Sequence, residues 1–228
     1  ISADSRQVYR GLDLGTGKVT REEMQGVPHH LLDVVEPNEL YSVADFQAAA
    51  YAAIDDVLAR GRVPILVGGT GLYVRSVTQG FTFTDSAPDP ALRAQLEEKS
   101  TQELYALLRA RTGVELTGGE ECNRHRLVRA LEKASAGALE NPPSQPRYRC
   151  LQLGVNYPRE TVCRRIDQRL QARLDAGMVE EVAALRAAGA TDEFLDRLGL
   201  EYRYILRYLT GELPDLDALK DGLGRAIK

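Results

Sequence analysis

The stretch Ile65-Leu66-Val67-Gly68-Gly69-Thr70-Gly71 decides the fold that we expect for this chain. Its first three residues form a short apolar run after Pro64, which is typical of a strand buried on both faces. A helical pattern follows directly over residues 72–77. The glycines of the turn would let backbone N–H groups approach an anion at the start of that helix, and Thr70 adds a hydroxyl donor. The alternative is a tight strand-to-helix turn without a ligand.

A helix is expected immediately before this stretch. Apolar side chains recur at helical spacing from Val43 to Leu58, so one face of the helix is buried. Ser42 and Asp45 form a capping-box-like start, and Gly61 supplies the left-handed residue that commonly ends a helix. Helix, buried strand, glycine turn and helix in succession predict a parallel α/β sheet.

The pattern changes after residue 85, where helical periodicity continues without a convincing strand. Asp89-Pro90 suits the start of one helix, and Ser100 with Glu103 suits the start of another. Residues 150–155 then predict a strand that returns to the sheet. We therefore expect an α/β core formed by residues 1–85 and 148–228, with a helical insertion at residues 86–147.

The composition is that of an ordinary globular protein. Of the 228 residues, 43% are hydrophobic and 27% are charged, and no apolar run is long enough for a transmembrane helix. The sequence opens with Ile1 and shows neither a starting Met nor a signal peptide, so we expect a fragment of a longer protein. Three widely spaced cysteines argue against a disulfide framework or a zinc ribbon and favour a reducing cytoplasm.

Charge is distributed unevenly along the chain. The net charge is −4, but residues 1–123 carry −7, residues 124–173 carry +7 and residues 174–228 carry −4. A basic middle between acidic flanks is typical of a polyanion-binding strip on a soluble enzyme. The alternative is that these arginines only decorate solvated helix faces.

Two arginine clusters lie in the basic middle. Arg165, Arg169 and Arg173 repeat every four residues beside an apolar stripe, so they share a helix face. Guanidinium groups bind phosphate bidentately, and the alternative is a solvated face that pairs with Asp167 or Glu160. The same two possibilities apply to the second cluster, formed by Arg124, Arg126 and Arg129.

Asp4 is the candidate general base. It follows the predicted end of a strand, and ligands of α/β sheets bind beyond the carboxyl ends of the strands. A carboxylate at that place suits proton abstraction. The alternative is an aspartate that stabilises a turn or caps a helix.

Two other motifs are not interpreted as sites. Gly17-Lys18 resembles the end of a Walker A loop, but Leu12 and Val19 occupy positions that need Gly and Ser or Thr, so no P-loop is predicted here. The pair His29-His30 has no carboxylate or Cys at ligand spacing, which favours a structural role over a metal site.

Taken together, these segments resemble the tRNA dimethylallyltransferase (tRNA isopentenyltransferase) family over nearly the whole chain. The family implies a P-loop-NTPase-like parallel sheet core with a helical inserted domain, in agreement with the layout predicted above. The ordered motifs that carry the resemblance are Ile1-Ser2-Ala3-Asp4-Ser5-Arg6-Gln7-Val8-Tyr9-Arg10, Asp13-Leu14-Gly15-Thr16 with Lys18, Val27-Pro28-His29-His30-Leu31, Tyr41-Ser42-Val43-Ala44-Asp45-Phe46, residues 64–73, Asp89-Pro90 with Arg93, and Arg126 with Arg129-Ala130-Leu131-Glu132.

The resemblance implies transfer of a dimethylallyl group from dimethylallyl diphosphate to N6 of the adenine immediately 3′ of the tRNA anticodon, which gives N6-isopentenyladenosine. Asp4 would be the general base, and Thr70 with Arg165 and Arg169 would hold the leaving diphosphate. Mg²⁺ would bridge the diphosphate, and the adenine must leave the anticodon stack. The diphosphate-binding turn would be Gly68, Gly69, Thr70 and Gly71. The tRNA-contacting positions would be Asp4, Ser5, Arg6, Gln7, Thr70, Arg93, His125, Arg126, Leu127, Val128 and Arg129.

The expected partners are therefore the tRNA anticodon stem-loop and dimethylallyl diphosphate, for a cytoplasmic monomer without membrane contact. The sequence departs from the family pattern in lacking a P-loop upstream of Ile1 and a basic, aromatic segment after Lys228. In addition, Cys122-Asn123-Arg124-His125 stands where the family usually has Pro-Asn-Asp. We expect these 228 residues alone to be weakly active or inactive, while the intact protein prenylates tRNA.

Three other functions compete with this interpretation. An adenylate isopentenyltransferase, which makes free cytokinin, performs the same chemistry on a nucleotide, but the inserted helices and the basic strip favour a large RNA. A non-catalytic RNA-binding remnant without its P-loop is the second alternative. A small-molecule kinase is the weakest, because only the fold suggests phosphoryl transfer.

Overall fold

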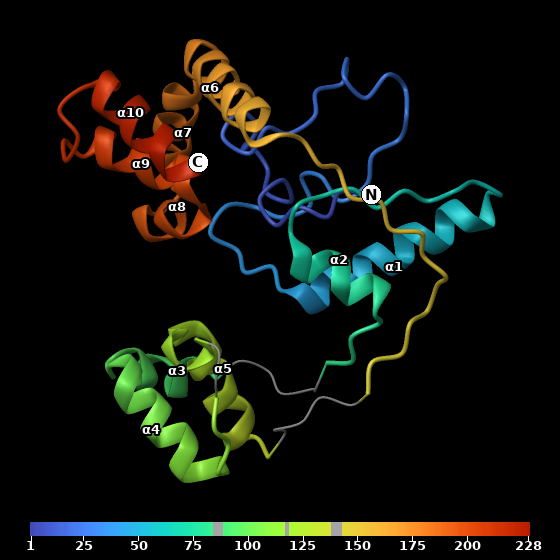
Figure 1. Cartoon of the computed structure of the whole chain (residues 1–228), viewed down its shortest axis with the longest axis vertical. Helices are drawn as coiled ribbons and strands as arrows, with labels where there is room; N and C mark the ends of the chain where they lie inside the picture. The colour runs from blue at the N-terminus through green and yellow to red at the C-terminus, as the bar shows by residue number, and fades with distance from the viewer. Residues whose placement is uncertain (84–88, 117–118, 138–142) are drawn as a thin grey trace. The chain divides into compact units, whose positions relative to one another are not determined.

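A computed structural model of the chain describes residues 1–83, 89–116, 119–137 and 143–228 (Figure 1). The chain divides into two compact units. The first joins Ile1–Thr78 to Arg147–Lys228, and the second is Gln79–Pro146. The predicted boundary between residues 85 and 86 lies outside the described residues. Within the described ranges, no helix is both long and apolar enough to cross a membrane.

In the first unit, helix α1 (Val43–Ala59) packs against helix α2 (Gly71–Thr78). The predicted capping box of α1 is confirmed, because the Ser42 hydroxyl accepts the Asp45 N–H and the Asp45 carboxylate accepts the Ser42 N–H. Gly61 follows the helix with a φ of +67°, as expected for a left-handed residue. A small core between the two helices consists of Ala3, Phe46, Ala50, Ile54, Tyr73 and Val77.

Most of the residues predicted to form the parallel sheet are extended but belong to no continuous strand among the described residues. Two backbone hydrogen bonds of 2.7 and 3.0 Å join residues 1–3 to Val67 in parallel orientation. On its other side the same segment is tied to His30 by one backbone hydrogen bond of 2.9 Å. A second isolated parallel bridge joins Tyr9 and Val35. The described residues therefore show parallel pairing, but not a continuous sheet.

The predicted burial of the strand at residues 65–67 is wrong. The segment pairs only with residues 1–3 among the described residues, and Ile65 and Val67 remain 67% and 64% exposed. The predicted returning strand at residues 150–155 is also wrong, since no backbone pairing of this segment is found in the described part of the chain. Its apolar side chains Leu151, Leu153 and Val155 are 86%, 85% and 85% exposed. An apolar run gives strand propensity, but burial depends on neighbours elsewhere in the chain.

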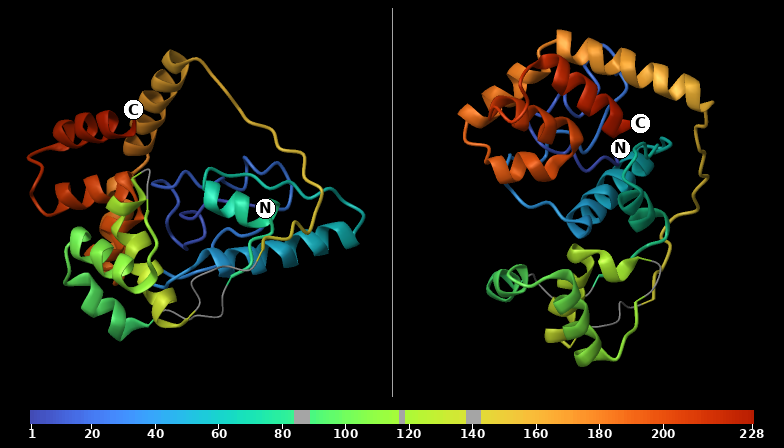
Figure 2. Two further views of the ribbon diagram at one scale, coloured as in Figure 1. Left: turned by 60° about the horizontal axis from the view of Figure 1, so that its bottom comes forward. Right: turned by 60° about the vertical axis from the view of Figure 1, so that its left-hand side comes forward.

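Five helices complete the first unit, and Figures 1 and 2 show the N-terminal loops, in blue, lying against them. Leu170 is the one buried residue of the helix that carries Arg165, Arg169 and Arg173, and Tyr202, Ile205 and Leu206 are buried in a later helix. The helices are α6 (Arg159–Asp175), α7 (Met178–Ala187), α8 (Asp192–Leu198), α9 (Leu200–Leu209) and α10 (Leu216–Ile227). The loops and these helices share a core whose fully buried members include Val8, Leu12, Met178, Val182, Leu195, Ile205, Leu219 and Leu223.

Lys18 has a structural role in the loop at residues 12–18. Its ammonium donates to the Tyr9 carbonyl (2.8 Å), to Asp13 Oδ1 (2.7 Å) and to Asp33 Oδ1 (2.5 Å), and its side chain is 6% exposed. These three acceptors use all three N–H donors of the ammonium group. The ammonium group of Lys18 is therefore fully hydrogen-bonded within the first unit.

Glu181 on α7 fixes the same loop. Its carboxylate accepts the N–H groups of Asp13 (3.0 Å), Leu14 (2.6 Å) and Gly15 (3.1 Å). The Tyr202 hydroxyl also donates to it, at 3.3 Å. Burial, followed by the nearby Glu181 carboxylate, raises the pKa of Tyr202. Glu181 thus ties the backbone of the loop to helix α7.

The second unit is helical in its described residues. The predicted caps are confirmed: the Asp89 carboxylate accepts two N–H groups of the first turn that Pro90 begins, and Ser100 forms a capping box with Glu103. The elements are α3 (Pro90–Glu97), α4 (Thr101–Thr112), a short 3₁₀ helix (Glu120–Cys122) and α5 (Arg124–Ser135). Their shared core is formed by Leu96, Leu104, Leu108, Leu127, Val128 and Leu131.

Candidate active site

Asp4 begins the turn that follows the paired segment 1–3. Its Oδ1 atom accepts the N–H of Arg6 at 2.8 Å and the N–H of Gln7 at 3.4 Å. Asp4 therefore stabilises a turn, which was the alternative to a catalytic role. The Oδ2 atom has no hydrogen-bond partner among the described residues, and the side chain is half-buried. The hydrogen bonds to Oδ1 orient the carboxylate, and the lone pairs of Oδ2 have no partner among the described residues.

Thr70 joins this turn to the glycine turn. Its hydroxyl oxygen accepts the N–H of Ser5 at 3.0 Å and lies 3.3 Å from the Ser5 hydroxyl oxygen. Its own N–H donates to the carbonyl of Ala3 at 3.2 Å. Two stretches that lie 65 residues apart in sequence, both predicted as site residues, are thus in direct contact.

Glycine is required at position 68 by packing. A Cβ atom built on Gly68 would lie 2.2 Å from the carbonyl oxygen of Ala3, so a side chain would separate the two paired segments. Gly69 and Gly71 have open space around a built Cβ. Close backbone approach explains the first glycine of the turn, and helix α2 begins at the last one.

Gln7 is held in place by three polar contacts. Its amide nitrogen donates to the carbonyls of Thr16 (3.4 Å) and Gly17 (3.2 Å), and its amide oxygen accepts the Ser2 hydroxyl (3.2 Å). The side chain of the neighbouring Arg6 is exposed. Gln7 therefore stabilises the loop beside Asp4, while Arg6 is accessible to a polyanion.

Two arginines of α6 line an open hollow of the first unit. The guanidinium carbon of Arg165 lies 4.2 Å from the ring centroid of Tyr157, a cation–π contact that the sequence did not predict, since Tyr157 precedes the helix. Arg165 and Arg169 line an open hollow of about 600 Å³ together with Tyr157 and Val162. In the described part of the chain, neither arginine is hydrogen-bonded to Asp4 or Thr70.

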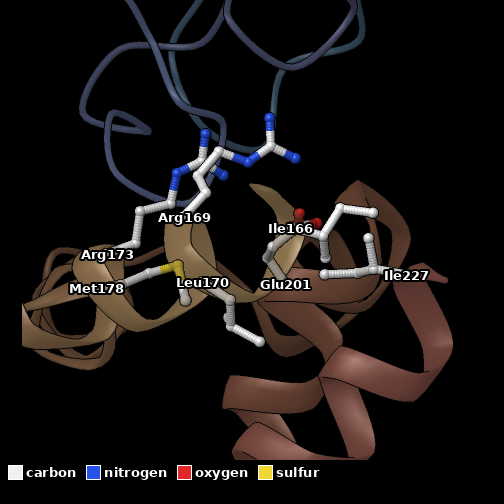
Figure 3. A pocket seen from close by; sticks show the side chains of 7 residues that line it. All are labelled: Ile166, Arg169, Leu170, Arg173, Met178, Glu201 and Ile227. Atoms are coloured by element: carbon white, nitrogen blue, oxygen red, sulfur yellow. The ribbon is translucent and has the colours of Figure 1, made fainter. Parts of the chain in front are cut away.

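Arg169 and Arg173 also border a small cavity of about 10 Å³, in which they point toward the blue N-terminal loops (Figure 3). Glu201 of α9 faces the same cavity. A Cβ atom on Gly17 would lie 1.7 Å from Nη2 of Arg173, so this guanidinium packs on the backbone of the loop. Burial lowers the pKa of Arg173, and the positive charge of Arg169 acts in the same direction. The cavity has room for about one water molecule.

The tRNA positions predicted on α5 divide into exposed and buried groups. His125 and Arg126 are exposed, and Arg129 is half-buried. Leu127 is 0% exposed and Val128 is 7% exposed, because both side chains belong to the core of the helical unit. Their side chains therefore do not face solvent, which corrects the prediction that they contact RNA. Arg93 on α3 is half-buried and forms an ion pair with Glu132, which the sequence did not indicate as a site residue.

The described residues do not build a magnesium site of their own. No group of three His, Cys, Asp or Glu side chains within the described ranges is arranged to hold a metal ion. The ring Nδ1 atom of His29 lies 2.9 Å from the carbonyl of Val27, which it contacts locally.

Comparisons with known proteins agree along nearly the whole chain. The family model described as IPP transferase matches residues 7–228. The tRNA dimethylallyltransferase 2 of Syntrophotalea carbinolica is 43% identical over 215 residues, which cover 93% of this chain and 72% of that protein. The tRNA dimethylallyltransferase of Thermobifida fusca is also 43% identical, over 97% of this chain and 71% of its own length.

A solved structure shows the same similarity. The full-length tRNA isopentenylpyrophosphate transferase from Bacillus halodurans is 35% identical and superposes with a TM-score of 0.69, covering 99% of this chain and 73% of its own. Sequence and structure thus match proteins of one kind from end to end. The chain belongs to the IPP transferase family.

Proposed function

We propose that the intact protein to which this chain belongs transfers a dimethylallyl group from dimethylallyl diphosphate to N6 of the adenine immediately 3′ of the tRNA anticodon. Family membership supports the prenyltransferase class, since its relatives are named tRNA dimethylallyltransferases. The observation that carries the proposal is the contact between the Asp4 turn and the Thr70 turn, through the Ser5 N–H and the Thr70 hydroxyl. It puts a carboxylate beside a hydroxyl and open glycines at the end of two parallel segments.

Asp4 would act as the general base in this reaction. The adenine N6 amine is a poor nucleophile, so removal of its proton as the new N–C bond forms lowers the barrier. The electron pair of the breaking C–O bond leaves with the diphosphate, and the amine proton goes to the carboxylate. Hydrogen bonds from the Arg6 and Gln7 N–H groups to Oδ1 keep the carboxylate in one orientation, which leaves Oδ2 for the proton.

Thr70, Arg165 and Arg169 would stabilise the negative charge of the leaving diphosphate, because donors aimed at developing charge lower the barrier of its departure. The turn at residues 68–71 would add backbone N–H groups. Mg²⁺ would neutralise part of the charge on the diphosphate oxygens when it is bound. Among the described residues, no hydrogen bond joins these arginines to Thr70, so each would reach the diphosphate by its own contact.

We assign tRNA binding to Arg6 and Gln7 in the first unit and to Arg93, His125, Arg126 and Arg129 in the helical unit. The basic charge of residues 124–173 supports a polyanion as partner. The proposed domain division has an α/β core at residues 1–85 and 148–228 and a tRNA-binding insertion at residues 86–147. The parallel pairing of residues 1–3 with Val67 supports a P-loop-like parallel sheet in that core.

We propose that the reaction takes place in the cytoplasm, where tRNA is available and cysteines stay reduced. All three cysteines of the chain are free, which suits a reducing compartment. None of the contacts described above involves a disulfide bond.

The experiment that tests the function offers the full-length gene product two acceptors. Dimethylallyl diphosphate and Mg²⁺ are supplied with either tRNA or AMP, and the products are identified as nucleosides by mass spectrometry. We expect N6-isopentenyladenosine in the tRNA digest and no prenylated AMP. Prenylated AMP without prenylated tRNA would identify an adenylate isopentenyltransferase instead, and tRNA binding without turnover would identify a non-catalytic RNA-binding protein.

A further inference from the structure

Glu132 is a buried carboxylate that the reaction described above does not use. Its side chain on α5 is 2% exposed and lies beside the apolar core of the helical unit. Taking a carboxylate out of water costs free energy unless it is paired and hydrogen-bonded. A hydrophobic residue of similar volume is often equally stable in such a place, so the presence of this charge points to a purpose besides stability.

Two arginines from different helices pair with this carboxylate. Arg93 of α3 donates from Nε to Oε1 and from Nη2 to Oε2, both at 3.0 Å. Arg129, one turn before Glu132 on α5, donates from Nη1 to Oε2 at 3.2 Å. The two arginine side chains remain 36% exposed. A buried anion thus fixes two guanidinium groups next to each other at the surface.

Further basic side chains lie on the same helix. Arg126, Arg129 and Lys133 are spaced by three and four residues, so they share one face of α5. Burial, followed by the charge of Arg129, lowers the pKa of Lys133. Basic side chains at this spacing suit a phosphate backbone as partner.

We propose that Glu132 is a positioning residue for tRNA binding, which holds Arg93 and Arg129 as a paired guanidinium surface for a phosphate group of the RNA backbone. The inference rests on the proposed function. Guanidinium groups recognise phosphate through planar, bidentate geometry, so fixing their orientation reduces the conformational entropy that binding would otherwise remove. Positive charge alone would not need Glu132, because its carboxylate lowers the net charge of the face.

The electrostatic and the positioning roles of Glu132 therefore predict opposite changes in tRNA affinity. Glu132→Gln keeps the size of the side chain but removes its negative charge, so a purely electrostatic role predicts tighter tRNA binding. Positioning predicts the opposite: KM for tRNA rises about tenfold, kcat at saturating tRNA is unchanged, and the slope of log affinity against log salt decreases by about one. Glu98→Gln is the charge-matched control, since Glu98 is exposed on the same unit, and it should leave KM unchanged or lower.

The assay uses the full-length gene product, and wild-type turnover is measured first. If the wild-type protein neither binds nor prenylates tRNA, the proposed function is wrong. If the wild-type protein does both, the positioning role is wrong when Glu132→Gln tightens tRNA binding or leaves KM and the salt slope unchanged. Thermal unfolding is compared with Leu131→Ala, a core variant of the same helix. If Glu132→Gln unfolds as readily as Leu131→Ala, the proposal is tested with Arg93→Lys instead. This substitution keeps the positive charge but removes the guanidinium group that donates two hydrogen bonds to Glu132. A wild-type KM for tRNA in this variant would overturn the proposal.

Discussion

At the scale of single residues, the chemistry depends on how the two oxygens of Asp4 are used. Backbone N–H groups bind Oδ1, and Oδ2 has no hydrogen-bond partner among the described residues. The structural and the catalytic interpretations of this aspartate are therefore compatible. A substitution that separates them must keep the acceptor of the turn and remove the base.

Asp4→Asn meets that requirement, because an amide oxygen can still accept the Arg6 and Gln7 N–H groups. We expect kcat to fall by about 10²- to 10⁴-fold, the usual contribution of a general base, with little change in tRNA affinity. Single-turnover prenylation and filter binding measure the two effects separately. A variant with wild-type kcat would exclude Asp4 as the base.

Thr70 gives a second prediction at this scale. Thr70→Val keeps the shape of the side chain but loses the acceptor for the Ser5 N–H, whereas Thr70→Ser keeps it. We expect the valine variant to lose about 1 kcal/mol of unfolding free energy and most of its turnover, and the serine variant to stay close to wild type. Urea unfolding and prenylation assays test this pair, and equal behaviour of the two variants would show that the hydroxyl is not needed.

At the scale of elements, Glu181 connects the loop at residues 12–18 to α7. Glu181→Ala would leave three backbone N–H groups of the loop without their acceptor. We expect the free energy of unfolding to fall by about 2–3 kcal/mol, since each hydrogen bond goes to a charged group. Glu180→Ala, at an exposed neighbouring position on α7, is the control. Equal unfolding midpoints for the two variants would contradict a role of Glu181 in anchoring the loop.

The segment after the helical unit is tied to α1 by Tyr148 and Arg147, which share the carboxylate of Asp55 at 2.7 and 2.5 Å. Burial, and then the hydrogen bond to Asp55, raises the pKa of Tyr148 to about 12. A phenol whose pKa is higher in the folded state keeps its stabilising effect below the unfolded pKa, near 10, and loses it as pH rises toward 12.

We therefore expect the stability difference between wild type and Tyr148→Phe to shrink between pH 10 and 12. Chemical unfolding across this range measures it, with the resonance of ¹³C-labelled tyrosine as an independent titration. The other tyrosines are the same in both proteins, so their titration cancels in the stability difference. A Tyr148 titration midpoint at the ordinary value, with a constant stability difference, would contradict the contact with Asp55.

The helix caps could be predicted from sequence because they are local. Ser42, Asp89 and Ser100 accept N–H groups only two or three residues away, so short spacing decides them. Strand burial at residues 65–67 and 150–155 could not be predicted in the same way, since it depends on which distant segments lie alongside.

The candidate site shows the same division. Asp4 and Thr70 were found through their place after predicted strands and through family motifs, but their mutual contact spans 65 residues. The pairing of Arg93 with Glu132 spans 39 residues, and periodicity on either helix gives no sign of it. Leu127 and Val128 were expected to contact tRNA because of the resemblance to the family, yet their helical phase places their side chains in the core.

At the scale of the whole molecule, the acidic average of −4 conceals two units with different tasks. The first unit holds the carboxylate and hydroxyl proposed for catalysis, and the helical unit holds paired arginines proposed for the RNA backbone. Substitutions in the helical unit should therefore change KM for tRNA, and substitutions at Asp4 should change kcat.

Acceptor selection by the full-length gene product is the most direct test of tRNA prenylation. Two anticodon stem-loops that differ only in having adenine or guanine immediately 3′ of the anticodon are incubated with dimethylallyl diphosphate and Mg²⁺, and their nucleosides are analysed by mass spectrometry. We predict N6-isopentenyladenosine from the adenine stem-loop alone. Prenylation of both stem-loops at other adenines, or of neither while free AMP is prenylated, would contradict the function proposed for this chain.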